Sequence, residues 1–378
     1  MKTENYKICG RCVMDTSDPE ITFDDNGYCN HCSNAFEIKE REWFPNKEGK
    51  KLLDNIVKKI KEDGKGKEYD CLIGLSGGVD SSYLACKVKE LGLNPLAVHV
   101  DAGWNSELAV NNIENIVKKL NIDLYTHVVD WEEMKDLQLA FLKAGVANQD
   151  TPQDNAIFAV KYKFAVKHNI KYVISGANFA TESILPSSWG YNAMDTKHIK
   201  AIHELFGKKK LKSYPMVSFF EQNIKFPYVN RFKIISPLNY MPYNRDEAIE
   251  YLAENYDWRS YGGKHHESKF TKYFQAYYLP KVFGYDKRRA HLSSLIVSGQ
   301  ITRDAAIEEI KKPLYDDAQL KEDQEFVMRK LALTNSEHEK LINSPKHYYY
   351  EYPNSQNDIV RLNKIIGFLS TIKHLGNK

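Results

Sequence analysis

A short turn rich in glycine and hydroxyl groups is the stretch of this sequence best suited to bind an anion. It is SGGVDS, residues 76–81, which follows an apolar run at residues 71–75 and leads into a helical pattern. Backbone N–H groups at such a turn converge on phosphate at a helix N-terminus. The turn lacks the G-x-x-x-x-G-K-[ST] pattern and its lysine, so it is not a Walker-type loop. We predict a phosphate-binding turn of another kind; a plain tight connection is the alternative.

Four of the six cysteines form two closely spaced pairs near the start of the chain. Cys9 and Cys12 form one C-x2-C pair, Cys29 and Cys32 form a second, and 16 residues separate the pairs. This spacing is typical of structural zinc sites with four thiolate ligands, which leave no open position for catalysis. An iron–sulfur cluster and a pair of disulfides are the alternatives. His31 lies inside the second pair, and we expect it to be a bystander rather than a ligand.

Strand-like and helical patterns alternate through the middle of the chain and would position the anion-binding turn. The strand-like runs are residues 71–75, 96–100, 124–129, 172–175 and 233–235. Helical patterns lie between them, among them residues 113–120 and 152–168. This alternation predicts a parallel sheet covered by helices on both faces, with a ligand crevice beyond the carboxyl ends of the strands.

The same patterns divide the chain into three expected regions. We predict a four-cysteine zinc segment at residues 1–45, an α/β nucleotide-binding domain at residues 46–240 and a helical region at residues 241–378. In the last region a helix should begin after Asn244, a suitable N-cap with Glu247 three residues further on.

Composition places the chain among folded proteins without a strong charge bias. Hydrophobic residues make up 42% and charged residues 27% of the 378 positions, and the formal net charge is +3. That charge is too small to indicate a general nucleic-acid binder. The start of the sequence has no apolar signal segment, and no run reaches the length of a membrane span, so we expect a cytoplasmic protein without a membrane partner.

The SGGVDS turn after a first strand resembles the signature of the PP-loop ATP pyrophosphatases, which include GMP, NAD and asparagine synthetases and tRNA thiolation enzymes. The resemblance implies a PP-loop (adenine nucleotide alpha hydrolase-like) domain that releases pyrophosphate from ATP. The implied ATP-binding residues are Ser76, Gly77, Gly78, Asp80, Ser81, Val100, Asp101, Gly176 and Asn178. Ser76 and Asp80 would be catalytic, and Asp80 and Glu182 would hold Mg²⁺. For Glu182 a plain surface carboxylate is the alternative.

Two longer stretches narrow the resemblance. CGRCVMDTSDPEITFDDNGYCNHC at the start and YGGKHHESKFTKYFQAYYLPKVFGYDKRRAHLSSLIVSGQITRDAA further on resemble the N-acetyl sugar amidotransferases of bacterial surface-glycan (lipopolysaccharide O-antigen) synthesis. That family implies conversion of an acetamido group on a nucleotide-activated sugar to an acetamidino group, with ATP consumed to AMP and pyrophosphate. The cofactors implied are ATP, Mg²⁺ and Zn²⁺.

A basic cluster in the second stretch is the candidate substrate site. Its members flank an aromatic stripe and are Lys264, His265, His266, Lys287, Arg288 and Arg289. Arginine forks and lysine charges suit the phosphates and carboxylate of a nucleotide-linked sugar acid. A solvated basic surface is the alternative. The aromatic stripe itself, Phe270 to Tyr278, reads as a core face of a helix.

The ammonia for such a reaction would come from another protein. Cys71 and Cys86 fall in core patterns, and position 1 is Met, so no glutaminase nucleophile is visible. The resembled family implies a separate glutaminase and a barrel subunit as partners. The runner-up is a tRNA thiolation enzyme with a zinc knuckle, which would need sulfur-carrying cysteines near the nucleotide.

Overall fold

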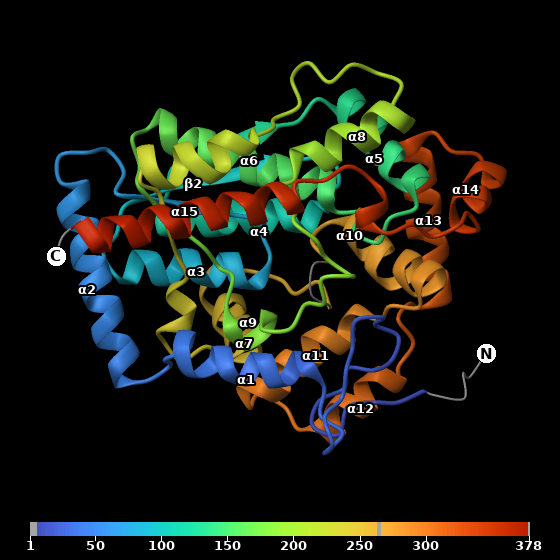
Figure 1. Ribbon diagram of the computed structural model, residues 1–378, viewed down its shortest axis with the longest axis horizontal. Coiled ribbons are helices and arrows are strands. Elements are labelled where there is room, and N and C mark those ends of the chain that lie inside the picture. Colours follow the sequence, from blue (N-terminus) through green and yellow to red (C-terminus); the bar gives the residue numbers. More distant parts are fainter. Residues whose placement is uncertain (1–5, 263–265, 377–378) are drawn as a thin grey trace.

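The computed structural model describes residues 6–262 and 266–376, and its centre is a five-stranded parallel sheet (Figure 1). Neighbouring strands follow the order β3-β2-β1-β4-β5, and every pairing is parallel. The strands are β1 (Cys71–Gly74), β2 (Pro95–Asp101), β3 (Leu124–Val128), β4 (Tyr172–Ile174) and β5 (Lys233–Ile235). All five expected strands are present, and the predicted α/β fold is confirmed.

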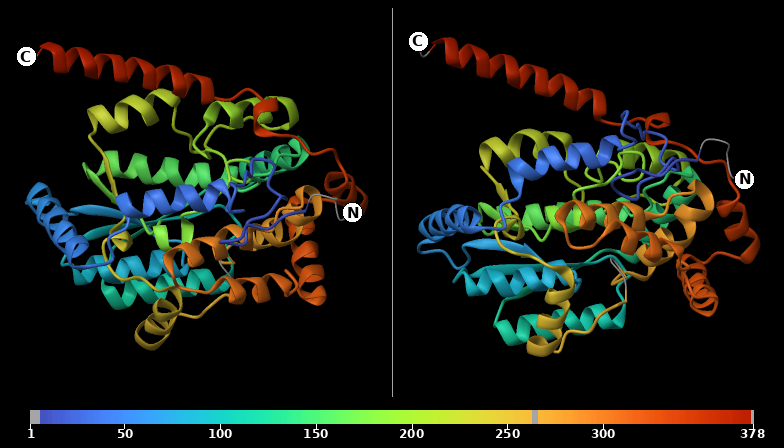
Figure 2. Two further views of the ribbon diagram at one scale, coloured as in Figure 1. Left: turned by 60° about the horizontal axis from the view of Figure 1, so that its bottom comes forward. Right: turned by 90° about the horizontal axis from the view of Figure 1, so that it is seen from below.

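Helices cover both faces of the sheet (Figures 1 and 2). One layer consists of α2 (Lys47–Gly64), α3 (Val79–Glu90), α4 (Glu107–Leu120) and α9 (Arg245–Tyr256). The other consists of α5 (Trp131–Ala144), α6 (Thr151–Lys167) and α8 (Thr196–Phe206). Along β1, Cys71 and Ile73 pack into the first layer and Leu72 into the second, because successive strand side chains alternate between faces.

The strand order reverses next to β1, and this creates the crevice for a ligand. The chain runs from β1 outward through β2 to β3, and then returns to add β4 and β5 on the other side. The connections after β1 and after β4 therefore leave the sheet in opposite directions, and a gap opens between them. Residues 76–81 follow β1, and the short helix α7 (Phe179–Glu182) follows β4.

The N-terminal segment is built from turns around the four cysteines, followed by α1 (Asn30–Glu42). Two isolated bridges, Ile8 to Asp15 and Phe23 to Cys29, hold the turns together. Helix α1 packs against α11 (Lys287–Ser298), far along the chain. The core that contains the four cysteines continues into residues of α5, α6 and the C-terminal helices, so the three expected regions share one packed interior.

The C-terminal part is helical, as expected. Its further elements are α10 (Lys269–Tyr273), η3 (Phe274–Phe283), α12 (Arg303–Lys311), α13 (Asp317–Leu331), α14 (Asn335–Ile342), η4 (Tyr349–Glu351) and α15 (Gln356–Gly376), while η1 (Glu221–Val229) and η2 (Pro237–Asn239) flank β5. The side chain of Asn244 accepts the amides of Asp246 and Glu247, so the expected N-cap of α9 is confirmed. Both views in Figure 2 show α15 standing off from the rest of the molecule.

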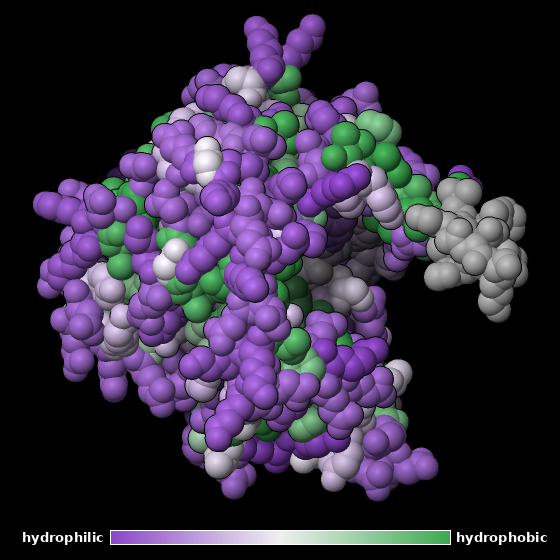
Figure 3. All heavy atoms as spheres, turned by 90° about the vertical axis from the view of Figure 1, so that its left-hand side faces the viewer, coloured by the Kyte–Doolittle hydropathy of each residue, from purple (hydrophilic) through white to green (hydrophobic). Residues whose placement is uncertain are grey.

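The aromatic stripe of the second family-like stretch lies in the interior. Four members of the predicted stripe are each at most 2% exposed, namely Phe270, Tyr273, Phe274 and Tyr278, and they confirm the core interpretation. The fifth, Tyr277, is partly buried and packs against the same core. The face shown in Figure 3 is mainly hydrophilic, with hydrophobic residues in separate patches. Across the described residues, we find no helix with the length and apolar character needed to cross a bilayer.

Candidate functional site

A pocket of about 270 Å³ lies at the carboxyl ends of β1, β2 and β4, where the strand order reverses. Its walls come from the turn after β1, the end of β2, the loop after β4, one face of α6 and the segment around α9. The residues that line it include Ser76, Gly78, Asp80, Ser81, Val100, Lys161, Gly176, Glu182, Arg245, Trp258, Tyr261 and Glu267. Seven of these are among the residues singled out in the sequence.

The SGGVDS turn is braced by its own two serines. The Ser81 hydroxyl accepts the Ser76 amide at 3.2 Å, contacts the Ser76 hydroxyl at 3.1 Å and donates to the Gly78 carbonyl at 3.1 Å. The Ser76 hydroxyl in turn accepts the Gly78 amide at 3.2 Å. These bonds explain why the six-residue turn contains two serine hydroxyls. They also fix the shape of the turn from which α3 starts.

One glycine of the turn is required by its backbone. Gly77 has φ +85°, and a Cβ there would lie 2.7 Å from the Ala109 carbonyl oxygen, so a side chain would collide with the main chain. A Cβ on Gly78 would lie 2.8 Å from a carboxylate oxygen of Glu267, at the end of a long side chain, so this contact does not by itself require glycine. Helix α3 begins at Gly78, which has no side chain to cap the first amides, so the helix dipole faces the pocket.

Three aromatic residues that follow β5 in the sequence form hydrogen bonds to this turn. The Trp258 indole donates to the Gly77 carbonyl at 2.8 Å, and the Tyr261 hydroxyl donates to the same oxygen at 2.9 Å. The buried Tyr243 hydroxyl donates to the Asp80 carboxylate. Burial, together with that carboxylate, raises the pKa of Tyr243 well above its usual range. The phenol therefore stays a donor to Asp80 at all physiological pH values.

Two cations in the pocket were not singled out in the sequence. Lys161 lies on α6, and burial lowers its pKa to about 8. Arg245 begins α9; its buried Nε has no hydrogen-bond partner among the described residues, and Asp246, at 3.6 Å, is a distant ion-pair partner. A partly buried guanidinium whose Nε donor is unused among the described residues is suited to an anionic ligand. Nothing local marks either residue, since each belongs to a helix that packs here only in the folded chain.

Asp101 and Asn178, which were expected to contact the nucleotide, instead form hydrogen bonds within their own loops. The Asp101 carboxylate accepts the Gly103 amide at 2.8 Å and the Asn105 side chain at 3.2 Å. The Asn178 side chain is 4% exposed and caps α7 by accepting the Thr181 amide. Neither side chain lines the pocket. Val100 and Gly176, which shortly precede these two residues in the sequence, do line the pocket. The ends of β2 and β4 therefore meet at the pocket as expected, while the side chains of Asp101 and Asn178 have structural roles.

The expected basic cluster is dispersed in the structure. Lys264 and His265 lie outside the described residues. His266 is partly buried, and burial lowers its pKa to about 4. Lys287 lies near Asp150 and Asp154, where its charge opposes the rise that burial causes in the pKa of both carboxyls. For Asp154 that pKa reaches about 7.

Arg288 and Arg289 have partner acids that the sequence did not reveal, and the assignment of both to substrate is corrected. Arg288 forms an ion pair with Asp286 at 2.8 Å and donates to carbonyl groups at the end of α12. Arg289 forms an ion pair with Asp15 at 3.0 Å and donates to the Val13 carbonyl at 2.8 Å. The Arg289 guanidinium therefore joins α11 to the N-terminal segment, the Arg288 guanidinium joins α11 to the end of α12, and neither lines the pocket.

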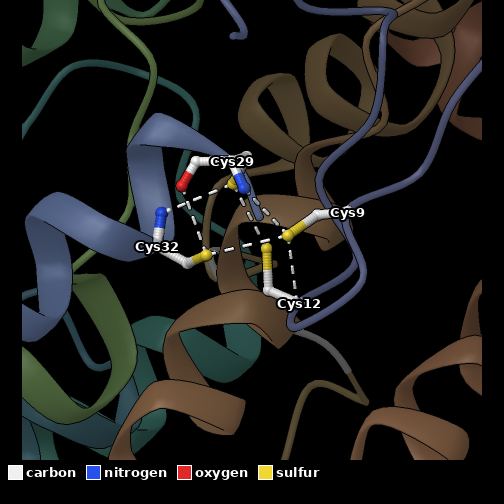
Figure 4. A group of neighbouring side chains, drawn as sticks. All are labelled: Cys9, Cys12, Cys29 and Cys32. Atoms are coloured by element: carbon white, nitrogen blue, oxygen red, sulfur yellow. Dashed lines mark hydrogen bonds between the residues drawn. The ribbon is translucent and has the colours of Figure 1, made fainter. Parts of the chain in front are cut away.

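The four cysteines form a compact, fully buried group (Figure 4). The Sγ atoms of Cys9 and Cys32 are 3.7 Å apart, and those of Cys12 and Cys29 are 3.6 Å apart. A tetrahedral zinc ion with Zn–S bonds of about 2.3 Å separates its sulfur ligands by about 3.8 Å. The donor set and its spacing therefore fit zinc. His31 points to Asp18 at 2.5 Å, in agreement with its expected role as a bystander.

The cysteine segment is connected to the pocket through α11. The Val13 amide donates to the Ser293 hydroxyl of α11 at 3.2 Å, and Arg289 of α11 donates to the Val13 carbonyl at 2.8 Å. Arg303, the first residue of α12, donates to the Cys9 carbonyl at 2.9 Å and to the Cys12 carbonyl at 3.1 Å. On its other side, α11 supports α7: the Ser294 hydroxyl accepts the Ile184 amide at 3.0 Å, and the Ser298 hydroxyl donates to the Ala180 carbonyl at 3.0 Å. Helix α7 ends at Glu182, which lines the pocket.

Comparisons with known proteins point to two groups of relatives. Residues 267–366 match the model of the LPS biosynthesis protein WbpG-like C-terminal domain. GMP synthase (glutamine-hydrolyzing) of Thermus thermophilus is 24% identical over 202 residues, which is 52% of this chain and 34% of that protein. An uncharacterized protein of Methanocaldococcus jannaschii is 38% identical over 76 residues, 20% of this chain and 27% of that protein. The chain thus spans about a third or less of these relatives.

Solved structures show weaker similarity. The NH3-dependent NAD synthetase of Campylobacter jejuni aligns with a TM-score of 0.29 and 17% identity, over 42% of this chain and 72% of that one. NMN synthetase of Francisella tularensis aligns with a TM-score of 0.29 and 20% identity, over 53% and 79%. At such scores the fold rests on the sheet topology described above, while the C-terminal region resembles a domain named for LPS biosynthesis.

Proposed function

We propose that this chain is an ATP-dependent amidotransferase that converts the acetamido group of a nucleotide-activated N-acetyl sugar to an acetamidino group. The observation that carries the proposal is the combination of the glycine-rich turn in the pocket with a C-terminal region that matches the WbpG-like domain of LPS biosynthesis. The pocket supports the nucleotide half of the proposal, and the match supports the sugar half.

The lining of the pocket supports binding of a triphosphate. The start of α3 and the cations Lys161 and Arg245 line the pocket together with the turn. Positive groups on several elements can stabilise negative charge that develops on a departing pyrophosphate. The similarity to GMP synthase covers about half of this chain.

The proposed reaction has two steps. The amide oxygen of the acetamido group attacks the α-phosphorus of ATP, and the bond to pyrophosphate breaks, which gives an O-adenylated imidate. Ammonia then adds to the imidate carbon, AMP leaves with the oxygen, and a proton is lost to give the acetamidino group. An amide oxygen is a poor leaving group by itself, and adenylation overcomes this difficulty.

Two metals belong to the proposal. Asp80 and Glu182 line the pocket with the oxygen ligands that Mg²⁺ prefers, and Mg²⁺ there would neutralise charge on the phosphates. Zinc in the cysteine group would be structural, because four thiolates complete its coordination. Among the expected substrate residues, His266 and Lys287 remain candidates for the sugar nucleotide.

Ammonia would come from a separate glutaminase, with a barrel subunit as a further partner. The two cysteines outside the zinc group are unsuited to glutamine hydrolysis, because both are fully buried. Burial raises the pKa of the Cys71 thiol well above its usual value and that of Cys86 to about 12. The same property disfavours the thiolation alternative, which would need a reactive thiol near the nucleotide.

The test is a product analysis by mass spectrometry. UDP- and CMP-linked N-acetyl sugars are incubated with the chain, ATP, Mg²⁺ and ammonium, and we expect the mass change of replacing the amide oxygen by NH, with AMP and pyrophosphate formed in equal amounts. Glutamine in place of ammonium should give no product. Asp80→Asn should abolish turnover, while Asp54→Asn, which changes an exposed carboxylate on α2 away from the pocket, is the matched control. Stoichiometric ADP instead of AMP would contradict the proposed chemistry.

A further inference from the structure

Arg11 places a guanidinium group against one sulfur of the four-cysteine group. Its Nε and Nη2 atoms each lie 3.4 Å from the Cys32 Sγ atom, so two N–H groups donate to the same sulfur. The Nη2 atom also donates to the Ser33 hydroxyl at 2.8 Å. Arg11 stands between Cys9 and Cys12, whereas Cys32 belongs to the second C-x2-C pair. The side chain therefore connects the first pair to a ligand of the second.

Two aromatic rings hold the guanidinium in this position. Its central carbon lies 4.6 Å from the centroid of the Tyr28 ring and 4.6 Å from that of the Phe36 ring. A planar cation gains from cation–π and stacking contacts with such rings, and a lysine ammonium cannot reproduce the planar stacking. Together with the Ser33 hydroxyl, the rings fix the orientation in which Arg11 donates to sulfur.

The other hydrogen bonds to sulfur come from the backbone and are unevenly distributed. Three amides donate to the Cys9 Sγ atom at 3.2 to 3.4 Å. The Cys29 Sγ atom accepts the Cys32 amide at 3.4 Å (Figure 4). In the described part of the chain, no amide donates to the sulfur of Cys12 or of Cys32. Of these two ligands, Cys32 receives its hydrogen bonds from a side chain instead.

Negative charge on the Cys32 sulfur needs such donors. Four thiolates carry more charge than one divalent ion neutralises, and all four cysteines are fully buried. The Cys29 carbonyl oxygen lies 3.4 Å from the Cys32 Sγ atom and disfavours further charge there. Arg303, another arginine at the group, donates to carbonyl oxygens of the first pair rather than to a sulfur. Among the described residues, Arg11 is thus the cation that meets this thiolate directly.

We propose that Arg11 is a positioning residue of the zinc site, which offsets charge on the Cys32 thiolate and holds this ligand against the first cysteine pair. Groups that donate to a metal ligand from outside the coordination shell orient it and tune its charge, and their loss typically costs about 10- to 100-fold in metal affinity. Arg11 therefore contributes to zinc retention without touching the ion. The inference goes beyond the proposed enzyme activity and rests only on the zinc site.

The test measures zinc affinity rather than turnover. Zinc dissociation constants are determined at fixed pH by competition with a chelator of known affinity. Arg11→Met keeps an unbranched stem but removes the charge and both donors, and we expect zinc binding about tenfold weaker or more. Arg11→Lys keeps the charge but loses the fork, so its constant should lie between the two. Lys7→Met is the matched control, because Lys7 is an exposed cation of the same segment that contacts the Phe23 ring.

A spectroscopic measurement separates hydrogen bonding from packing. Cobalt(II) replaces zinc, and the sulfur-to-cobalt charge-transfer band is recorded for each variant. In Arg11→Met the band should move to lower energy, because the thiolate electrons are held less tightly once both donors are lost. A purely structural role for Arg11 would lower the melting temperature and leave the band in place, and that result would overturn the inference.

The remaining outcomes are equally decisive. An unchanged zinc constant in Arg11→Met would overturn the inference, and so would equal weakening in Lys7→Met, since any cation of the segment would then suffice. If Arg11→Met does not fold, Arg11→Lys applies the same test, and an unchanged constant there would refute the role of the paired donors. Failure of the unaltered chain to bind zinc or cobalt would overturn the metal site itself, and pyrophosphate binding by that chain would still test the nucleotide site separately.

Discussion

Replacing Cys32 by serine tests whether the four-cysteine group holds a structural zinc ion that supports the nucleotide pocket. The substitution exchanges a thiolate for a hydroxyl, which is a poor zinc ligand, and it keeps the size of the side chain. Sulfur separations of 3.6 and 3.7 Å leave little room for a water molecule to replace the lost ligand at the same geometry. We therefore expect zinc to fall from one ion per chain to a small fraction.

The expected loss of stability is large because the metal organises a buried segment. All four cysteines are fully buried, and Arg303 and Arg289 hold the backbone around them. Loss of a structural metal belongs to the group of changes that cost about 4 kcal/mol or more. At about 2–4 °C per kcal/mol for domains of this order of size, the melting temperature should fall by about 8 °C or more.

The structure also predicts an effect on the pocket. The cysteine segment contacts α11 through Val13, and α11 holds α7 and therefore Glu182. Cys32→Ser should weaken binding of Mg²⁺-pyrophosphate at temperatures where the chain remains folded. The assays are metal analysis, a thermal melt and calorimetry, with Cys86→Ala as the control, because it removes a buried thiol outside the metal group.

Four results would each refute a part of this reasoning. Purified protein without any metal would remove the zinc site, and protein with iron and inorganic sulfide would replace it by the iron–sulfur alternative. Cys32→Ser with full zinc content and an unchanged melting temperature would show that the fourth thiolate is not a ligand. A drop in stability without any change in pyrophosphate binding would leave the metal in place but refute the connection through α11.

Further variants test the charges in and around the pocket. Because burial lowers the pKa of Lys161 to about 8, calorimetric pyrophosphate binding should weaken as the pH rises through that value and the ammonium loses its proton; Lys161→Arg should flatten this dependence. Arg245→Gln should weaken pyrophosphate binding several-fold without lowering the melting temperature, since the partly buried guanidinium has a donor unused among the described residues; a destabilised variant would contradict this. Arg288→Ala and Arg289→Ala should lower the melting temperature and leave the KM for ATP and sugar unchanged, whereas a selective rise in the sugar KM would restore their assignment to substrate.

Local sequence was sufficient for the features that depend on neighbouring residues. A glycine-rich turn between a strand and a helix has its geometry determined by six consecutive residues, and the structure places it at the pocket as expected. The two C-x2-C pairs likewise carry their own turns, so their spacing predicted the buried sulfur group. The central strands β1, β2 and β4 followed from apolar runs because they are buried on both faces of the sheet, whereas the edge strands β3 and β5 are largely exposed.

The partners of charged side chains could not be found in this way. Arg288 and Arg289 read as free cations in the sequence, but Asp286 and Asp15 neutralise them, and Asp15 lies more than 270 positions away. Conversely, no local pattern marks Lys161, Arg245 and Glu267 as residues of the pocket. They meet the turn only because α6, α9 and the segment before α10 pack at the same end of the sheet. Backbone geometry at a turn is a local property, so a short stretch of sequence determines it. Charge pairing depends on which distant elements meet, and only the tertiary structure decides that.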